Sequence, residues 1–237
     1  MDIGAILSEA WSLYTRFFVR FVVVAGVVFL ALGALSTIIE SGSSADRGSS
    51  LLVTLASLVV SIIGYFWIQG VLVVLTVDVR DGVADHTFGE LFARVRPKLG
   101  ALILAGVLGA IGIVVGFLLV IVPGLYLLTR WSMIAPALVI EDLSAGESFS
   151  RSHELVRGRA WPVFGLLIVL FLINVIAGLV IVSLAHGIAG GPVGDWLGAA
   201  VANTLITPFI AIATTLVYFL LAGDRPRRGH EPPARAF

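Results

Sequence analysis

The placement of positive charge along this chain constrains its fold more than any other feature. Six apolar stretches of about bilayer length are present, near 17–39, 51–79, 99–122, 125–141, 161–185 and 197–222. Of the 15 Lys and Arg residues, all except Arg47 and Arg130 lie in the segments that would share one side of a membrane if each stretch crossed it. Positive charge marks the cytoplasmic side. The pattern therefore predicts six transmembrane helices with both termini in the cytoplasm.

Composition supports a membrane protein and excludes several other classes. The chain is 59% hydrophobic and 13% charged, whereas soluble domains have about 45–50% and about 25%. Its net charge of +0 offers no general attraction for nucleic acid, and the absence of cysteine excludes disulfides and thiolate sites. We expect one transmembrane domain over residues 1–223 and a short polar cytoplasmic tail over 224–237.

Each outward span follows a short amphipathic segment. In the first, Ile3, Ile6, Ala10 and Tyr14 recur at helical spacing, with Leu7 and Trp11 on the same face. The other two begin with capping-box patterns at 87–90 and 144–147. Residues 89–94 and 146–151 also match at four of six positions, although amphipathic helices can agree by chance. We predict an all-α bundle of six transmembrane helices with three interfacial helices and a pseudo-threefold repeat.

The middle third of the chain resembles a known membrane family. Its landmarks are Pro123, Gly124, Tyr126, Arg130, Pro136, Glu141, Arg151, Ser152, Leu155, Gly158 and Trp161, joined by Leu-Ser-Glu-Ala-Trp at 7–11. These resemble the membrane domain of the glycerophosphoryl diester phosphodiesterase family, a group of six-span bacterial proteins related to the YciC-like proteins. Where that family closes with a Tyr-Tyr-Asp-Leu-Arg-like segment, this chain offers only the displaced Asp224. The resemblance implies a module of the bacterial plasma membrane without hydrolase activity, because the soluble phosphodiesterase domain is not present.

Arg130 is the one cation inside an apolar run. It follows the Pro123-Gly124 pair, predicted to form the turn, by six residues, which places it about 9 Å along a helix and in the outer half of the membrane. Such a residue is a functional candidate because a central Arg costs about 2.5–3.5 kcal/mol to insert. Three roles stay open. Arg130 can reach the interface beside Trp131 or bind backbone carbonyls, it can contact a lipid phosphate or another anion, or it can pair with an acid.

Neutral polar groups define a second candidate site. Asn174, Asn203 and Thr207 are deep in the last two spans, and Pro208 should kink the last one. Together with Arg130 they could form a substrate site of a small transporter or channel. The alternative is that they form hydrogen bonds between helices, worth about 0.6 kcal/mol each. Gly112 and Gly116 form a GxxxG pattern that indicates close helix packing with an unidentified partner.

Charged residues on the predicted cytoplasmic side form the third candidate. A basic collar suited to anionic headgroups comprises Arg94, Arg96, Lys98, Arg151, Arg157 and Arg159. Glu141 and Asp142 are expected to bridge to the arginines that follow them rather than to act as a carboxylate pair. Convergence of Asp78, Glu141 and a histidine would instead indicate an intramembrane enzyme.

No catalytic, cofactor or metal motif is found in the sequence, and the four histidines lack metal-ligand spacing. We therefore expect a non-enzymatic protein that interacts with membrane lipids, anionic ones in particular. It would act in envelope lipid handling or as an accessory to a membrane-protein partner or a second copy. The alternative is the small transporter or channel.

Overall fold

A computed structural model describes residues 2–41 and 47–223, with side chains over 2–33, 57–191 and 194–223. All regular secondary structure in these residues is helical. The elements are α1 (Ile3–Arg16), α2 (Phe18–Ser41), α3 (Arg47–Val79), α4 (Phe88–Val95), a 3-10 turn η1 (Arg96–Lys98), α5 (Leu99–Leu119), α6 (Ile121–Arg130), α7 (Ile134–Glu141), α8 (Ala145–Val156), α9 (Ala160–Ala189) and α10 (Gly191–Ala222). The predicted tail, 224–237, and residues 42–46, between the first two predicted spans, lie outside the described residues.

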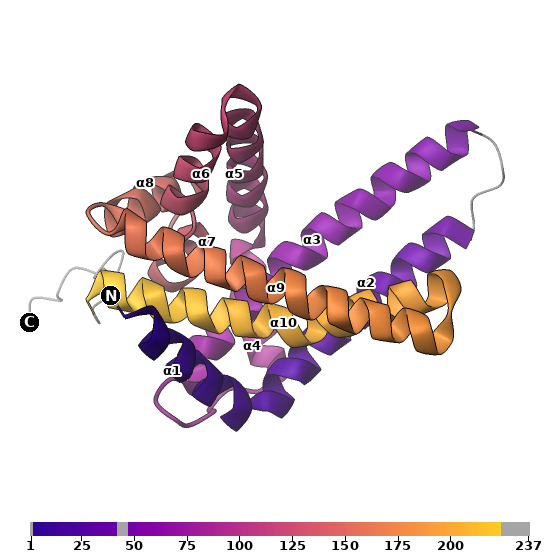
Figure 1. Cartoon of the computed structure of the whole chain (residues 1–237), viewed down its shortest axis with the longest axis horizontal. Coiled ribbons are helices and arrows are strands. Elements are labelled where there is room, and N and C mark those ends of the chain that lie inside the picture. The colour runs from indigo at the N-terminus through magenta and orange to yellow at the C-terminus, as the bar shows by residue number, and fades with distance from the viewer. Residues whose placement is uncertain (1, 42–46, 224–237) are drawn as a thin grey trace, which may run out of the picture.

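The helices are long and apolar enough to make this a multi-pass membrane protein. Within the described residues five helical stretches qualify as spans, and a sixth arises if α1 and α2 count as one bent span. The all-α prediction is thus confirmed. Their order repeats three times, as a short amphipathic helix, a long outgoing helix and a returning one. In Figure 1 the α5–α6 hairpin points away from the α9–α10 hairpin, whereas α2 runs beside α10 and α3 diverges from it.

The three short helices join their spans differently. α1 meets α2 at an angle of 81°, as expected for a helix that crosses the face of a bundle before the chain turns. α4 instead continues through η1 into α5, so that Phe88–Leu119 is a single apolar stretch. Both predicted capping boxes are confirmed, at Thr87 with Glu90 and at Ser144 with Glu147. Hydrogen bonds from the Ser144 side chain and backbone lower the pKa of Glu147 below its usual value.

The packed core lies where the three short helices meet the long ones. Fully buried side chains include Leu72, Leu91, Leu138 and Tyr218, which come from α3, α4, α7 and α10. Away from this core the helices expose apolar side chains, up to 88% for Ile188 near the end of α9. That distribution suits a bundle whose outer faces are solvated by lipid rather than by water.

The turn between α5 and α6 is not at Pro123-Gly124, as predicted, but three residues earlier. Val120 is the extended residue between the helices, and Pro123 lies in the first turn of α6, where a missing N–H costs nothing. Gly124 serves close packing instead. A Cβ on Gly116 would lie 3.0 Å from the Gly124 Cα, and one on Gly112 would lie 2.5 Å from the Trp131 ring. The GxxxG partner is therefore intramolecular, namely α6 and the residue that follows it.

The connection between the last two helices is much shorter than the interval of 186–196 left between the predicted spans. α9 runs to Ala189 and α10 starts at Gly191, which leaves Gly190 between them at φ 68°. The positive φ and the absence of a Cβ let one glycine reverse the chain. His186 Nδ1 then lies 2.7 Å from Asp195 Oδ1, joining the two helices beside the turn.

Candidate functional site

Arg130 lies farther from the α5–α6 turn than the sequence predicted. Because the turn is at Val120, Arg130 is ten residues past it, about 15 Å along the helix, and it ends α6 against α8. Its Nη1 donates a hydrogen bond to the His153 carbonyl at 3.3 Å, while its own carbonyl accepts one from the Ser152 hydroxyl at 2.7 Å. Arg130 thus lies farther from the turn than the predicted distance of about 9 Å, and its side chain reaches toward the short helix α8.

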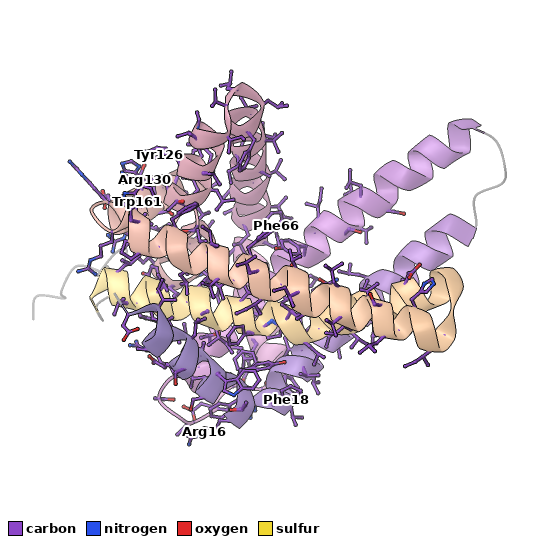
Figure 2. All side chains as sticks on the ribbon, in the orientation of Figure 1. Arg16, Phe18, Phe66, Tyr126, Arg130 and Trp161 are labelled. Carbon is purple, nitrogen blue, oxygen red and sulfur yellow. The ribbon has the colours of Figure 1, made fainter. Side chains whose placement is uncertain are left out.

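An apolar groove lies beside this guanidinium. It has a volume of about 380 Å³ and is lined from α6 and the start of α9 by Val122, Leu125, Tyr126, Thr129, Arg130, Ala160, Trp161 and Phe164. We call it the Arg130 groove. Arg130 Cζ lies 5.1 Å from the centre of the Tyr126 ring, and Trp161 is 82% exposed at the groove. Figure 2 shows Tyr126, Arg130 and Trp161 close together where the α5–α6 hairpin diverges from α9.

Most of the donors of Arg130 are unused. Its Nε is buried without a hydrogen-bond partner, and in the described part of the chain its only side-chain hydrogen bond is the one to His153. No described acid forms an ion pair with it, so the predicted structural ion pair is not observed in that part. Trp131 packs edge to face on Phe149, with ring centres 5.0 Å apart. The groove therefore combines an apolar surface with an under-satisfied cation.

The polar residues proposed as a transport site do not converge. Asn203 lines a separate cavity of about 460 Å³ between α2, α3 and α10, next to Trp196. Asn174 is exposed on α9, and Thr207 is buried within α10. Pro208 lies inside α10, which continues as one helix past it. The structure thus separates Arg130 from the three neutral residues with which the sequence grouped it.

Three members of the basic collar are engaged within the protein. Lys98 Nζ binds the Val139 carbonyl at 2.8 Å and Asp142 at 2.9 Å. Arg151 binds Glu141, as described below. Of the others, Arg159 Nη1 reaches the Leu220 carbonyl at 3.5 Å. The remaining members, Arg94, Arg96 and Arg157, are exposed.

The predicted bridge from Glu141 to a following arginine is confirmed, and it is buried. Arg151 Nε donates to both carboxylate oxygens of Glu141, at 2.9 and 3.0 Å. The Tyr218 hydroxyl donates to Glu141 Oε1 at 2.5 Å, a contact that sequence spacing could not reveal because 77 residues separate the pair. Glu141 is 2% exposed and Arg151 14%. The cluster ties together α7, α8 and α10.

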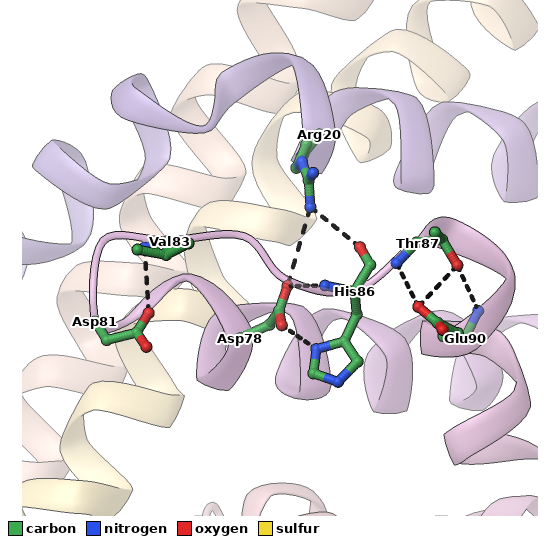
Figure 3. Close-up of polar contacts among 7 residues, drawn as sticks. All are labelled: Arg20, Asp78, Asp81, Val83, His86, Thr87 and Glu90. Carbon is green, nitrogen blue, oxygen red and sulfur yellow. Dashed lines mark hydrogen bonds and ion pairs between the residues drawn. The ribbon is translucent and has the colours of Figure 1, made fainter.

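A second polar cluster, shown in Figure 3, joins the loop at 80–87 to α2 and α3. The Asp78 carboxylate contacts the His86 ring and accepts the His86 backbone N–H at 3.4 Å. Arg20 Nη1 donates to the His86 carbonyl at 3.2 Å and lies 4.0 Å from Asp78 Oδ2. Asp78 and a histidine thus converge, but Glu141 belongs to the other cluster. In the described residues no three His, Cys, Asp or Glu side chains form a group that could hold a metal ion.

Comparison with known proteins places the chain in a family. A family profile described as "Domain of unknown function (DUF7847)" matches residues 4–223, nearly all of the chain. No curated protein and no solved structure was found to match. The family match carries no link to the phosphodiesterase family, and that resemblance therefore rests on the sequence landmarks alone.

Proposed function

The chain belongs to the DUF7847 family, and we propose that it is a non-enzymatic, lipid-binding protein of the bacterial plasma membrane. In this proposal the Arg130 groove holds one anionic lipid, with the guanidinium at the headgroup and an acyl chain along the apolar wall. The protein would act in envelope lipid handling or as an accessory to a membrane partner.

The proposal rests on one observation, namely that most N–H donors of the Arg130 guanidinium have no acceptor among the described residues. A guanidinium has five N–H donors, and a cation in apolar surroundings is costly unless those donors are satisfied. Here one hydrogen bond and one aromatic face are its partners among the described residues. A phosphate or carboxylate accepts two parallel N–H bonds from such a fork. An anionic lipid supplies both that acceptor and the hydrocarbon to fill about 380 Å³ of apolar groove.

The test is native mass spectrometry of the protein extracted in its own membrane lipids. We expect wild type to retain an anionic lipid that Arg130→Leu loses. Arg130→Lys should retain it weakly, because an ammonium is a point charge without the bidentate fork. Arg16→Leu is a matched control, since Arg16 also donates to one backbone carbonyl, that of Gly82 at 3.1 Å, and lies over a ring, that of Phe17. Arg16 does not line the groove.

Reconstitution separates the two anionic chemistries. Nanodiscs doped with phosphatidylglycerol should give a bound lipid through its phosphate, and nanodiscs doped with oleate would give one through a carboxylate. Identical lipid profiles for wild type, Arg130→Leu and Arg16→Leu would refute the proposal. Arg130 would then be held by the His153 carbonyl and the Tyr126 ring alone.

The transporter alternative has less support, because Arg130 and Asn203 line different cavities. The proposed cytoplasmic location of both termini is open to a direct test, since the chain has no cysteine. A cysteine at Gly89 or at Gly187 would meet nothing within 4 Å. An impermeant maleimide added to intact cells should label Gly187→Cys and spare Gly89→Cys. The reverse pattern would invert the topology.

A further inference from the structure

A polar cavity of about 480 Å³ lies among α3, α4, η1, α7 and the loop at 80–87. Its charged and titratable lining residues are Asp78, Asp81, Asp85, His86, Arg94 and Lys98. It shares no lining residue with the Arg130 groove. Neither the family description nor the proposed lipid function assigns it a role.

The acidic wall of this cavity is held in place from several directions. The buried Asp78 carboxylate contacts the His86 ring and accepts a hydrogen bond from the His86 backbone N–H, and Arg20 donates one to the His86 carbonyl. Earlier in the loop Arg16 Nη2 binds the Gly82 carbonyl at 3.1 Å. Asp85 lies between Gly82 and His86, and Asp81, just before Gly82, accepts a hydrogen bond from the Val83 backbone N–H at 3.2 Å. A site whose walls are fixed before binding avoids much of the cost of ordering them.

The two signs of charge face the same cavity without neutralising each other. No ion pair within 4.0 Å joins Asp81 or Asp85 to Arg94 or Lys98 in the described part of the chain. Lys98 forms its ion pair with Asp142 instead. Glu90, the nearby acid of α4, accepts hydrogen bonds from the Thr87 backbone N–H and hydroxyl. Arg94 on one wall and Asp85 on the other are therefore available to a ligand.

We propose that this cavity binds a small zwitterion that carries a primary ammonium and a phosphate. The ammonium would meet the carboxylates of Asp85 and Asp81, and the phosphate would meet the guanidinium of Arg94, as charge-assisted hydrogen bonds require. The cavity volume of about 480 Å³ is ample for phosphoethanolamine. Phosphoethanolamine exists free in solution and as the headgroup of a phospholipid, and both forms carry the same ammonium and phosphate groups.

Calorimetric titration of the detergent-solubilised protein with O-phosphoethanolamine tests the proposal. We expect binding that Asp85→Asn and Arg94→Gln each weaken about tenfold or more, because each removes one hydrogen-bonded charge pair. Arg96→Gln is the matched control, being an exposed arginine two residues away that does not line the cavity. Phosphocholine should bind more weakly, since its quaternary ammonium has no N–H to donate.

Nanodiscs distinguish the source. Retention of phosphatidylethanolamine over phosphatidylcholine, lost in Asp85→Asn, would identify the lipid headgroup, whereas titration by the soluble compound alone would identify a free ligand. Absence of both kinds of binding would overturn the proposal. The proposal would also be overturned if inorganic phosphate bound as tightly as phosphoethanolamine and if Asp85→Asn did not change the affinity for phosphoethanolamine. Arg130→Leu should leave this binding unchanged, and so the two proposed sites can fail separately.

Discussion

Replacement of Arg151 by methionine should destabilise the protein more than any other single loss of charge in the described region. In the native protein Arg151 Nε donates two hydrogen bonds, at 2.9 and 3.0 Å, to the carboxylate of Glu141. Methionine fills similar space with no donor. Glu141, 2% exposed, would keep only the Tyr218 hydroxyl as a partner among the described residues.

The magnitude follows from the burial of the pair. Breaking a buried ion pair by removing one partner costs about 3–5 kcal/mol, because the remaining charge is desolvated without compensation. For a chain of this size about 1 kcal/mol lowers Tm by roughly 2–4 °C, so Arg151→Met should lower Tm by roughly 6–20 °C. An exposed arginine has no such effect, since surface pairs contribute about 0–1 kcal/mol.

The measurement is the loss of monodisperse protein on heating in detergent, followed by fluorescence-detected size exclusion. Arg157→Met is the control, because Arg157 is an exposed arginine in the adjoining segment. The double variant Arg151→Met with Glu141→Leu should recover part of the loss, since it removes the stranded charge. Equal Tm values for Arg151→Met and Arg157→Met would refute the view that the buried bridge stabilises this junction.

Three further outcomes are expected. Gly116→Leu should lower Tm by an amount equivalent to about 1–3 kcal/mol, because a Cβ at this position would lie 3.0 Å from the α6 backbone. Gly100→Leu is the control and should leave Tm unchanged, because a Cβ there would meet nothing within 4 Å. Equal Tm values for the two variants would contradict this expectation. Ser144→Ala should lower Tm at neutral pH. Because the pKa of Glu147 is lowered in the folded protein, the cap stabilises α8 fully at a pH above 4.5, the ordinary pKa of this side chain. This stabilisation is lost as the pH falls through the lowered pKa, so the difference in Tm between wild type and Ser144→Ala should shrink in acid. His86→Ala should speed amide exchange in the loop at 80–87 about tenfold, and unchanged protection would show that Asp78 does not anchor it.

Most of the helices could be predicted because their signals are local. A run of about 20 apolar residues must satisfy its backbone internally in a bilayer, and a Ser or Thr three residues before a Glu can cap a helix with no help from elsewhere. The predicted spans at 17–39, 51–79 and 99–122 accordingly lie within a few residues of α2, α3 and α5. The turn between α5 and α6 was misplaced for a local reason as well. Glycine and proline also serve helix packing and helix starts, as at Gly124 and Pro123.

The candidate sites divide in the same way. Arg130 and the bridge from Glu141 to Arg151 could be inferred, because an isolated charge in an apolar run, or an acid followed by arginines, restricts its own surroundings. The role of Tyr218 could not be inferred, nor could the placement of Asn203 far from Arg130 or the meeting of Arg94 with Asp85 across one cavity. Those depend on how the three hairpins pack, which is decided by contacts between residues tens of positions apart. The sequence by itself determined that the chain crosses a membrane as helices and which residues needed partners. Only the tertiary structure decided which partners they found, because helix packing distributes small energies over many distant contacts.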